Sequence, residues 1–271
     1  MMRSLWTAAS GMIAQQTNVD TIANNLSNVN TTGYKTEKTE FKSLLYQNLQ
    51  ARTTTANGEN KPIPAQVGLG TRVASNTSMF TQGPMLASES DTAFAIEGEG
   101  FFAVRGGDGE IYYTRNGNFT WSIGTNNIML TTSEGYPVLD SNGNAITVPA
   151  GVATERVKAS TTGEFYYTDA DGNIFPMNQQ LGVYQFNNPS GLDKRGSSLL
   201  AVTDASGAAM NEATTPGLKL SKVNQNYLEG SNVQVADEMV NLIVAQRAYE
   251  LNSKAIQASD EMLSQANQLR R

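Results

Sequence analysis

The stretch ANNLSNVNTTGYK, Ala23–Lys35, decides how the chain is organised, because it closes a long helical pattern that begins near Arg3. Upstream and within it, two sets of residues recur every seven positions and form an a/d heptad seam with Gln15 as its polar member. The sets are Leu5, Met12, Val19 and Leu26, and Ala8, Ile22 and Val29. We therefore expect a helix over about residues 3–29, ended by Gly33 as a left-handed cap or turn residue.

This first helix carries very little charge. Between Ser4 and Tyr34 the only charged residue is Asp20. A helix face turned to water normally carries Lys and Glu, but here it carries Thr, Ser, Gln and Asn, which are poor helix formers. We interpret it as a helix whose second face also meets protein. This favours self-assembly over a monomeric helical hairpin, which would leave that face in water.

The C-terminal part repeats the heptad pattern. A second helix is expected from Val235 to about Leu269, with Ser231 and Asn232 at the position of an N-cap. Its seam consists of Val235, Leu242, Tyr249, Ile256 and Leu263, with Met239 and Ala245 beside them. A seam of about five heptads favours coiled-coil pairing. The two ends of the chain are therefore expected to pair with each other.

Between the helices the hydrophobic period switches to two. Short candidate strands over about residues 72–225 are separated by turn signals such as Asn116-Gly117 and Asn142-Gly143. The absence of interleaved helices predicts an all-β antiparallel body. Before it, Thr39–Gln50 is expected to form a short helix or part of an extended arm, with the helix preferred, and residues 51–70 a loop or interaction arm.

The predicted fold class is α+β: long N- and C-terminal coiled-coil helices that flank an inserted all-β antiparallel domain. The expected limits are 1–35 for the first helix, 36–71 for an extended arm, 72–225 for the β domain and 226–271 for the second helix.

Composition excludes several function classes. The chain has 271 residues, a net charge of −6, no cysteine and no histidine. An acidic chain is not expected to bind nucleic acid or an anionic membrane, and no lipid anchor is expected. The missing residues exclude thiol catalysis, a Ser-His-Asp triad and a His-based zinc site. We expect no catalytic residue, metal or cofactor, and we expect the apolar part of the first helix to be too short and too interrupted for the core of a signal peptide.

Two local motifs are interpreted as turns. Gly98-Glu99-Gly100 lacks the third glycine and the helix of a dinucleotide site. Asp169–Asn173 suggests a calcium loop, but its glycine is misplaced and Gln180 stands where the bidentate Glu belongs.

The motif in Ala23–Lys35 resembles the N-terminal signature of bacterial flagellar rod and hook proteins. The residues that carry it are Asn24, Asn25, Asn28, Thr32, Gly33, Tyr34 and Lys35. EGEGFFAV and YYTRNGNF in the middle of the chain, and LEGSNV and EMVNLIVAQRAYELNSKAIQASDEML near its end, continue the resemblance. Within the family, the segment over about residues 46–71 resembles the extension of distal rod proteins.

The resemblance implies a structural subunit that is exported through the flagellar apparatus without a cleaved signal peptide and lies in the basal body, outside the cytoplasmic membrane. Its implied partners are further copies of itself in a helical polymer, proximal rod proteins, the hook protein and, where an outer membrane exists, the bushing-ring proteins. The polymer would be the drive shaft that carries motor torque to the hook, with Gly33 as a hinge. The alternatives are a proximal rod or hook-type protein, or a monomeric all-β adhesin.

Overall fold

The computed structural model describes residues 2–50, 65–124, 127–149, 152–169 and 172–268. The chain divides into two compact units, which are described separately. The helical unit consists of Met1–Ser27, Glu37–Ser78 and Gln234–Arg271, and the β unit of Asn28–Thr36 and Met79–Val233. The domain limits expected from the sequence stay a prediction.

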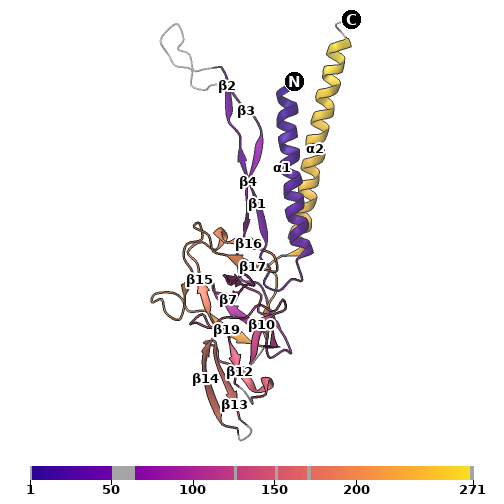
Figure 1. Ribbon diagram of the computed structural model, residues 1–271. Coiled ribbons are helices and arrows are strands. Elements are labelled where there is room, and N and C mark those ends of the chain that lie inside the picture. The colour runs from indigo at the N-terminus through magenta and orange to yellow at the C-terminus, as the bar shows by residue number, and fades with distance from the viewer. Residues whose placement is uncertain (1, 51–64, 125–126, 150–151, 170–171, 269–271) are drawn as a thin grey trace. The chain divides into compact units, whose positions relative to one another are not determined.

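Two long helices form the first layer of the helical unit, as expected from the heptads (Figure 1). Helix α1 spans Met2–Ser27 and helix α2 spans Val235–Gln268. They run antiparallel, because Ser4 near the start of α1 is hydrogen-bonded to Ser259 near the end of α2, with 3.1 Å between the two Oγ atoms. At the other end, Asn25 Nδ2 donates to Glu238 Oε2 over 3.1 Å. The pairing of the two chain ends is confirmed, whereas a coiled-coil supercoil stays a prediction.

The expected N-cap of α2 is wrong. The helix begins at Val235, and the N–H of Glu238 donates to the carbonyl of Gln234. Ser231 Oγ instead accepts the N–H of Val233, and Asn232 is engaged by other segments of the β unit. Both polar side chains therefore shape the approach to the helix and not its first turn.

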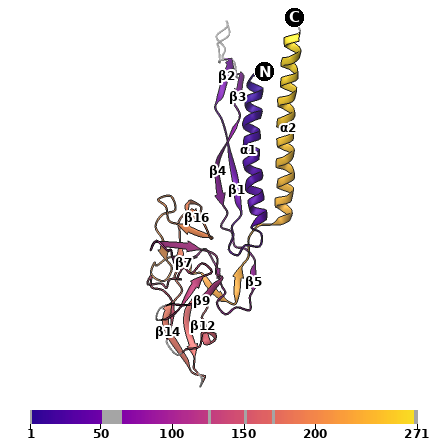
Figure 2. The ribbon, with the colours of Figure 1, turned by 45° about the vertical axis from the view of Figure 1, so that its right-hand side comes forward.

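A two-stranded ribbon lies along α1 (Figure 2). It consists of β1 (Glu37–Ser43) paired with β4 (Thr71–Ser78), and β2 (Tyr46–Gln50) paired with β3 (Ala65–Gly68), both antiparallel. The short helix expected over Thr39–Gln50 is wrong, because these residues form β1 and β2. Their apolar spacing fits a helix, but pairing with a distant strand overrides so short a pattern. Residues 51–64 of the expected arm lie outside the described residues.

The ribbon covers part of the charge-poor face of α1. Thr39 Oγ1 donates to Thr21 Oγ1 over 2.9 Å, and the N–H of Glu37 donates to Asn25 Oδ1 over 2.9 Å. Further along, the N–H of Thr71 reaches Ser10 Oγ at 3.4 Å. The expectation that this face meets protein is therefore met in part by the chain's own ribbon.

The β unit is antiparallel throughout its described pairings, as predicted. Its sheets have the strand orders β16-β17-β8-β7-β15-β18, β11-β10-β9, β12-β13-β14, β19-β6 and β20-β5. The strand bounds are β5 (Met85–Ala87), β6 (Phe94–Glu97), β7 (Phe101–Arg105), β8 (Ile111–Thr114), β9 (Phe119–Ile123), β10 (Ile128–Thr132), β11 (Thr147–Val148), β12 (Val157–Ala159), β13 (Glu164–Thr168), β14 (Ile174–Gln180), β15 (Val183–Gln185), β16 (Asp193–Arg195), β17 (Leu199–Ala201), β18 (Met210–Asn211), β19 (Lys222–Gln225) and β20 (Tyr227–Glu229). Short 3-10 turns occupy Thr154–Arg156 and Pro189–Gly191.

Aromatic side chains fill the core of the β unit. In the larger cluster, Phe94 meets Phe165 edge-on at a centroid distance of 5.8 Å, and Phe102 meets Phe119 at 5.2 Å. A smaller cluster surrounds Phe101, which packs edge-on against Phe186 and Phe80. Large buried rings in edge-to-face contact are the geometry that aromatic pairs prefer. This core makes the β unit a rigid support for the segments attached to it.

Two turns that the sequence predicted contain glycines with positive φ. Gly143 and Gly172 have φ of 82° and 85°, which only glycine adopts without strain. Between β13 and β14, the N–H of Asp169 donates to the carbonyl of Asn173 over 2.9 Å. Residues 170 and 171 of this expected turn lie outside the described residues.

Candidate assembly interface and N-terminal motif

The predicted seam of α1 faces inward. Ala8 and Ile22 are buried, and the remaining members are half-buried: Leu5, Met12, Val19, Leu26 and Val29. Three other residues of α1 are buried outside this seam, namely Ala14, Thr21 and Asn25. A role of the seam residues in assembly stays a prediction.

On α2 the contact with α1 is displaced from the predicted seam. The buried residues of α2 are Glu238, Ala245 and Ser259, which continue with half-buried Asn252 at a period of seven. Of the predicted seam, Leu242 and Ile256 are half-buried, whereas Val235, Met239, Tyr249 and Leu263 are exposed. The centre of the contact thus consists of small and polar residues, which a search for large apolar side chains does not find.

Small residues let the two helices approach closely. A Cβ added to Gly11 on α1 would lie 2.9 Å from Asn252 Nδ2 on α2. A larger residue at this position would have to displace the Asn252 side chain. Polar contacts lie near both ends of the pair, at Ser4–Ser259 and Asn25–Glu238.

The early part of α2 exposes an apolar surface. Met239, Val240, Ile243 and Val244 are all exposed although they follow one another within two turns, and Val244 is 62% exposed. A helix segment that is apolar on most sides belongs in a protein interior. A separate exposed apolar side chain, Trp6, is 74% exposed near the start of α1, beside the other end of α2. We call the α2 group the outer apolar face; patches of this kind mark interaction sites.

The N-terminal motif bridges several segments. Asn25 Nδ2 donates to the carbonyl of Glu37 over 2.8 Å as well as to Glu238, while its Oδ1 accepts from Glu37. One amide therefore ties α1 to both α2 and β1. Asn24 lies on the exposed side of α1. These bonds explain why the motif has an asparagine at position 25, which the helical periodicity did not predict.

The second half of the motif belongs to the β unit. Asn28 Oδ1 accepts from Thr31 Oγ1 over 3.1 Å, Thr32 Oγ1 donates to Asn116 Oδ1 over 2.8 Å, and Tyr34 is half-buried. Gly33 has φ of 70°, so its predicted left-handed conformation is confirmed. Its N–H donates to the carbonyl of Glu229 over 2.8 Å. A Cβ here would lie 2.6 Å from the backbone of Arg115. These contacts fix Gly33 tightly and favour a clamped turn over the expected hinge.

Lys35, the last residue of the motif, enters a buried charge cluster. Its Nζ lies 2.6 Å from Glu229 Oε1, and both side chains are almost fully buried. Arg115 Nε approaches Glu229 Oε2 at 3.5 Å. Burial lowers the pKa of Lys35, an effect that Glu229 opposes and Arg115 adds to. Burial likewise lowers the pKa of Arg115.

Arg115 connects this cluster to the turn between β6 and β7. It donates to the carbonyls of Gly100 and Gly98 over 2.7 and 2.8 Å, and its guanidinium lies 5.4 Å from the ring centre of Phe101. The glycine pair that the sequence marked as a turn thus supplies acceptors for a buried cation. Arg115 and Glu229 were missed as site residues, although both lie within motifs that carried the resemblance.

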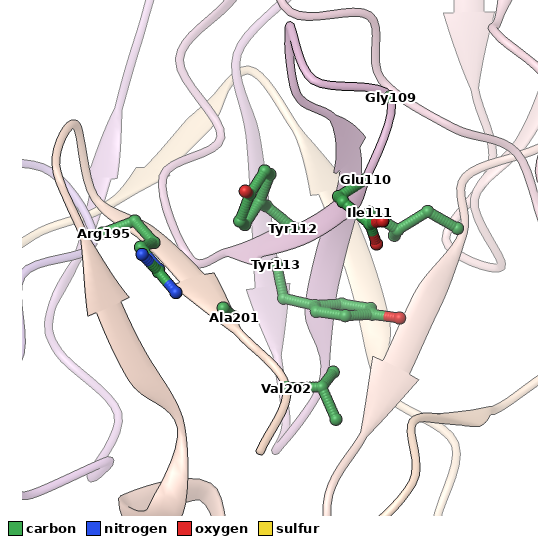
Figure 3. Close-up of a pocket in the computed structure, with 8 residues that line it drawn as sticks. All are labelled: Gly109, Glu110, Ile111, Tyr112, Tyr113, Arg195, Ala201 and Val202. Carbon is green, nitrogen blue, oxygen red and sulfur yellow. The ribbon is translucent and has the colours of Figure 1, made fainter.

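An open hollow of about 530 Å³ lies on the six-stranded sheet, between β8 and β16–β17 (Figure 3). Its lining residues are Gly109, Glu110, Ile111, Tyr112, Tyr113, Arg195, Ala201 and Val202. Tyr112 is engaged by Asp108 over 2.6 Å, which raises the pKa of the tyrosine, and the Tyr113 hydroxyl points away from Arg195. The hollow offers hydrogen-bonding groups but no pairing of a nucleophile with a base.

Among the described residues, neither helix is long and apolar enough to cross a membrane.

Comparison with known proteins places the chain. Three family profiles match: "Flagella basal body rod protein" over residues 5–35, "Flagellar hook protein FlgE/F/G D1 domain" over 95–167 and "Flagellar basal body rod FlgEFG protein C-terminal" over 224–269. A protein of Borreliella burgdorferi named flagellar basal-body rod protein FlgG is 45% identical over the full length of both chains. The chain belongs to the flagellar basal-body rod protein family.

Further relatives of this rod protein carry the same name. FlgG of Agrobacterium fabrum is 38% identical over 97% of both chains, and FlgG of Bacillus subtilis is 36% identical over the full length of both. The resemblance found in the sequence is therefore confirmed. The profile at the N-terminus ends at Lys35, where the structure places the buried charge cluster.

Proposed function

We propose that this protein is a structural subunit of the distal rod of the bacterial flagellar basal body. It polymerises helically into the drive shaft that carries motor torque to the hook. It acts outside the cytoplasmic membrane, between proximal rod proteins and the hook protein, and within the bushing rings where the cell has an outer membrane. It carries out no catalysis and needs no metal or cofactor.

The observation that carries this proposal is the outer apolar face of α2. Met239, Val240, Ile243 and Val244 are exposed in the single chain, on a helix whose opposite side already packs against α1. Burying a side chain of this size contributes about 1.5–3 kcal/mol. Further copies of the chain are the natural partners, since the relatives are rod proteins. A contact of this face with a different surface of the next copy produces an open filament when the rotation between copies does not close a ring.

The assignment to the distal rod has separate support. The matched relatives named FlgG span the whole chain, including the ribbon that follows the N-terminal motif. The end of that ribbon exposes Leu45, Tyr46 and Leu49, of which Leu45 is 82% exposed. These side chains would bind neighbouring subunits and stiffen the shaft. A proximal rod or hook-type position is the competing assignment.

The position in isolated basal bodies tests the proposal. Antibody labelling of a tagged chain in electron micrographs is expected to mark the rod segment next to the hook. Labelling confined to the motor end or to the hook would reject the distal assignment. A strain lacking the protein is expected to form neither a distal rod nor a hook, and normal hooks in that strain would reject the function itself.

A seam variant separates assembly from folding of the monomer. Leu26→Asp in α1 and Ile256→Asp in α2 replace half-buried seam residues and are expected to abolish motility while the β unit stays resistant to protease. An unpaired carboxylate in a packed seam costs several kcal/mol. Normal swimming of either variant would contradict the seam assignment.

A further inference from the structure

Five residues of the β unit form a hydrogen-bonded clasp. They are Lys35, Thr36, Thr81, Glu229 and Asn232, and they come from three separate segments of the chain. Asn232 Oδ1 accepts from both the N–H and the hydroxyl of Thr36, each over 2.7 Å. Its Nδ2 donates to the carbonyl of Met79 over 2.8 Å and to Thr81 Oγ1 over 2.8 Å. One amide side chain thus joins all three segments.

Lys35 and Glu229 form the second half of the clasp. Lys35 Nζ donates to the carbonyl of Thr81 over 2.7 Å and to Glu229 Oε1 over 2.6 Å. The same oxygen of Glu229 accepts the N–H of Gly83 over 2.9 Å. The Lys35–Glu229 pair therefore connects the same three segments as Asn232, and it does so out of contact with water. Backbone bonds add to it, since the N–H of Met79 donates to the carbonyl of Thr36 over 2.8 Å.

The clasp lies where the chain leaves the β unit. The chain passes between the two units four times, after Ser27, Thr36, Ser78 and Val233. Thr36 is itself a clasp residue, Met79 accepts from Asn232, and Val233 directly follows Asn232. The remaining passage, at Ser27, leads within six residues to Gly33, whose N–H is bound by Glu229. All four connections are thus fastened to one another on their β-unit side.

The bonds between the connecting segments matter mechanically because a single connecting segment can rotate freely about its backbone dihedrals. Each residue of a free strand has two soft backbone dihedrals, so torque applied through one strand turns it and is not passed on. Strands tied side by side by several hydrogen bonds and a buried ion pair can turn only together. Polar bonds shielded from water resist opening, because each opened group is left without a partner.

We propose that this clasp is the anchor through which torque passes between the helical unit and the β unit in the assembled rod. Its residues are positioning residues for the mechanical task of the rod and are not needed for the contacts between subunits. The inference rests on the proposed function, because it presumes a rod under torque. It predicts variants that assemble normally and fail only under load.

A graded series of variants tests this. Thr36→Val removes one hydroxyl bond to Asn232 and keeps the shape of the side chain, whereas Asn232→Ala removes the whole set of amide contacts. Thr162→Val is the matched control, because Thr162 is exposed and its hydroxyl bonds only weakly to Ser160 at 3.4 Å. Each full-length variant replaces the protein in living cells. Hooks per cell are counted first, and swimming speed and shed hooks are then measured in media of increasing viscosity.

Equal hook numbers are expected for all variants in thin medium. In viscous medium, Asn232→Ala is expected to shed hooks at least about tenfold more often than the control, and Thr36→Val to fall in between. Load curves that coincide with the control would overturn the inference. If Asn232→Ala fails to assemble, Thr36→Val decides alone by the same criterion. Load-insensitive variants in cells that require the protein for hooks would reject the clasp but leave the proposed function intact.

Discussion

Two adjacent residues of α2 offer a sharp test of the outer apolar face. Val244 is 62% exposed, whereas Ala245 is 1% exposed and follows the buried Glu238 after seven residues. We expect Val244→Asp to block assembly without unfolding the chain. We expect Ala245→Asp to break the helix pair itself. The control is Gln246→Asp, which places the same carboxylate at an exposed polar position.

The magnitudes follow from burial. A buried methylene is worth about 0.8 kcal/mol, so truncating Val244 to alanine loses about 1 kcal/mol per contact once its exposed part is buried by a neighbour. That corresponds to about fivefold weaker association. A carboxylate buried without a partner costs several kcal/mol, which is about a thousandfold or more. In the single chain, a substitution at so exposed a site changes the free energy of unfolding by about 0.5 kcal/mol or less.

The assay compares assembly with stability. Hooks per cell and soft-agar swimming report assembly, and thermal unfolding of the purified full-length chains reports stability. The expected order for assembly is Gln246→Asp near normal, Val244→Ala reduced and Val244→Asp absent, with unchanged unfolding for all three. Normal rods with Val244→Asp would refute the assignment of the outer apolar face. Unfolding of its monomer would show that Val244 serves the fold and not assembly.

Three further variants test the β unit. Gly33→Ala combines a left-handed strain of about 1–2 kcal/mol with a Cβ placed 2.6 Å from the backbone of Arg115, whereas Gly109→Ala meets no atom within 4 Å and carries the strain alone; urea unfolding should rank Gly33→Ala as less stable. Glu229→Gln leaves two buried cations without their carboxylate and is expected to cost about 3–5 kcal/mol in the same assay. Burial raises the pKa of Tyr113 to about 12, so the folded state resists ionisation and stability is lost as pH rises from about 10 to about 12. Tyr113→Phe should lose less stability than the original chain between about pH 10 and about pH 12, and an equal loss in thermal unfolding would contradict this.

Sequence periodicity predicted the elements whose signal is long. Both helices show their apolar repeat over many turns. The turns at Gly143 and Gly172 have positive φ, which glycine adopts without strain. It failed at Thr39–Gln50, where the apolar spacing over three turns was compatible with a helix. Pairing of β1 with β4, about thirty residues further on, decided the outcome, and such long-range pairing has no local signature.

The candidate site shows a similar limit. Lys35 was singled out, but its partner Glu229 lies 194 residues away in the sequence. Neither Arg115 nor Glu229 stands out by composition, because a buried charge is recognised only from what surrounds it. On α2, the predicted seam included Ala245 beside its large residues but omitted Glu238 and Ser259, which are also buried, because a search for apolar heptads passes over polar side chains.

Two features account for the scarcity of charge on α1: cover by the chain's own ribbon, and the proposed contact with neighbouring copies. Part of its polar face is covered by the ribbon, where Thr21 and Asn25 are buried and bonded to β1. That part no longer supports self-assembly, because the chain satisfies it alone. The case for assembly passes instead to the exposed Trp6 on α1 and to Val244 and its neighbours on α2, which nothing within the described helical unit covers. The buried Lys35–Glu229 pair holds the N-terminal motif within the β unit. The exposed apolar side chains of the helical unit are instead available to neighbouring copies of the chain.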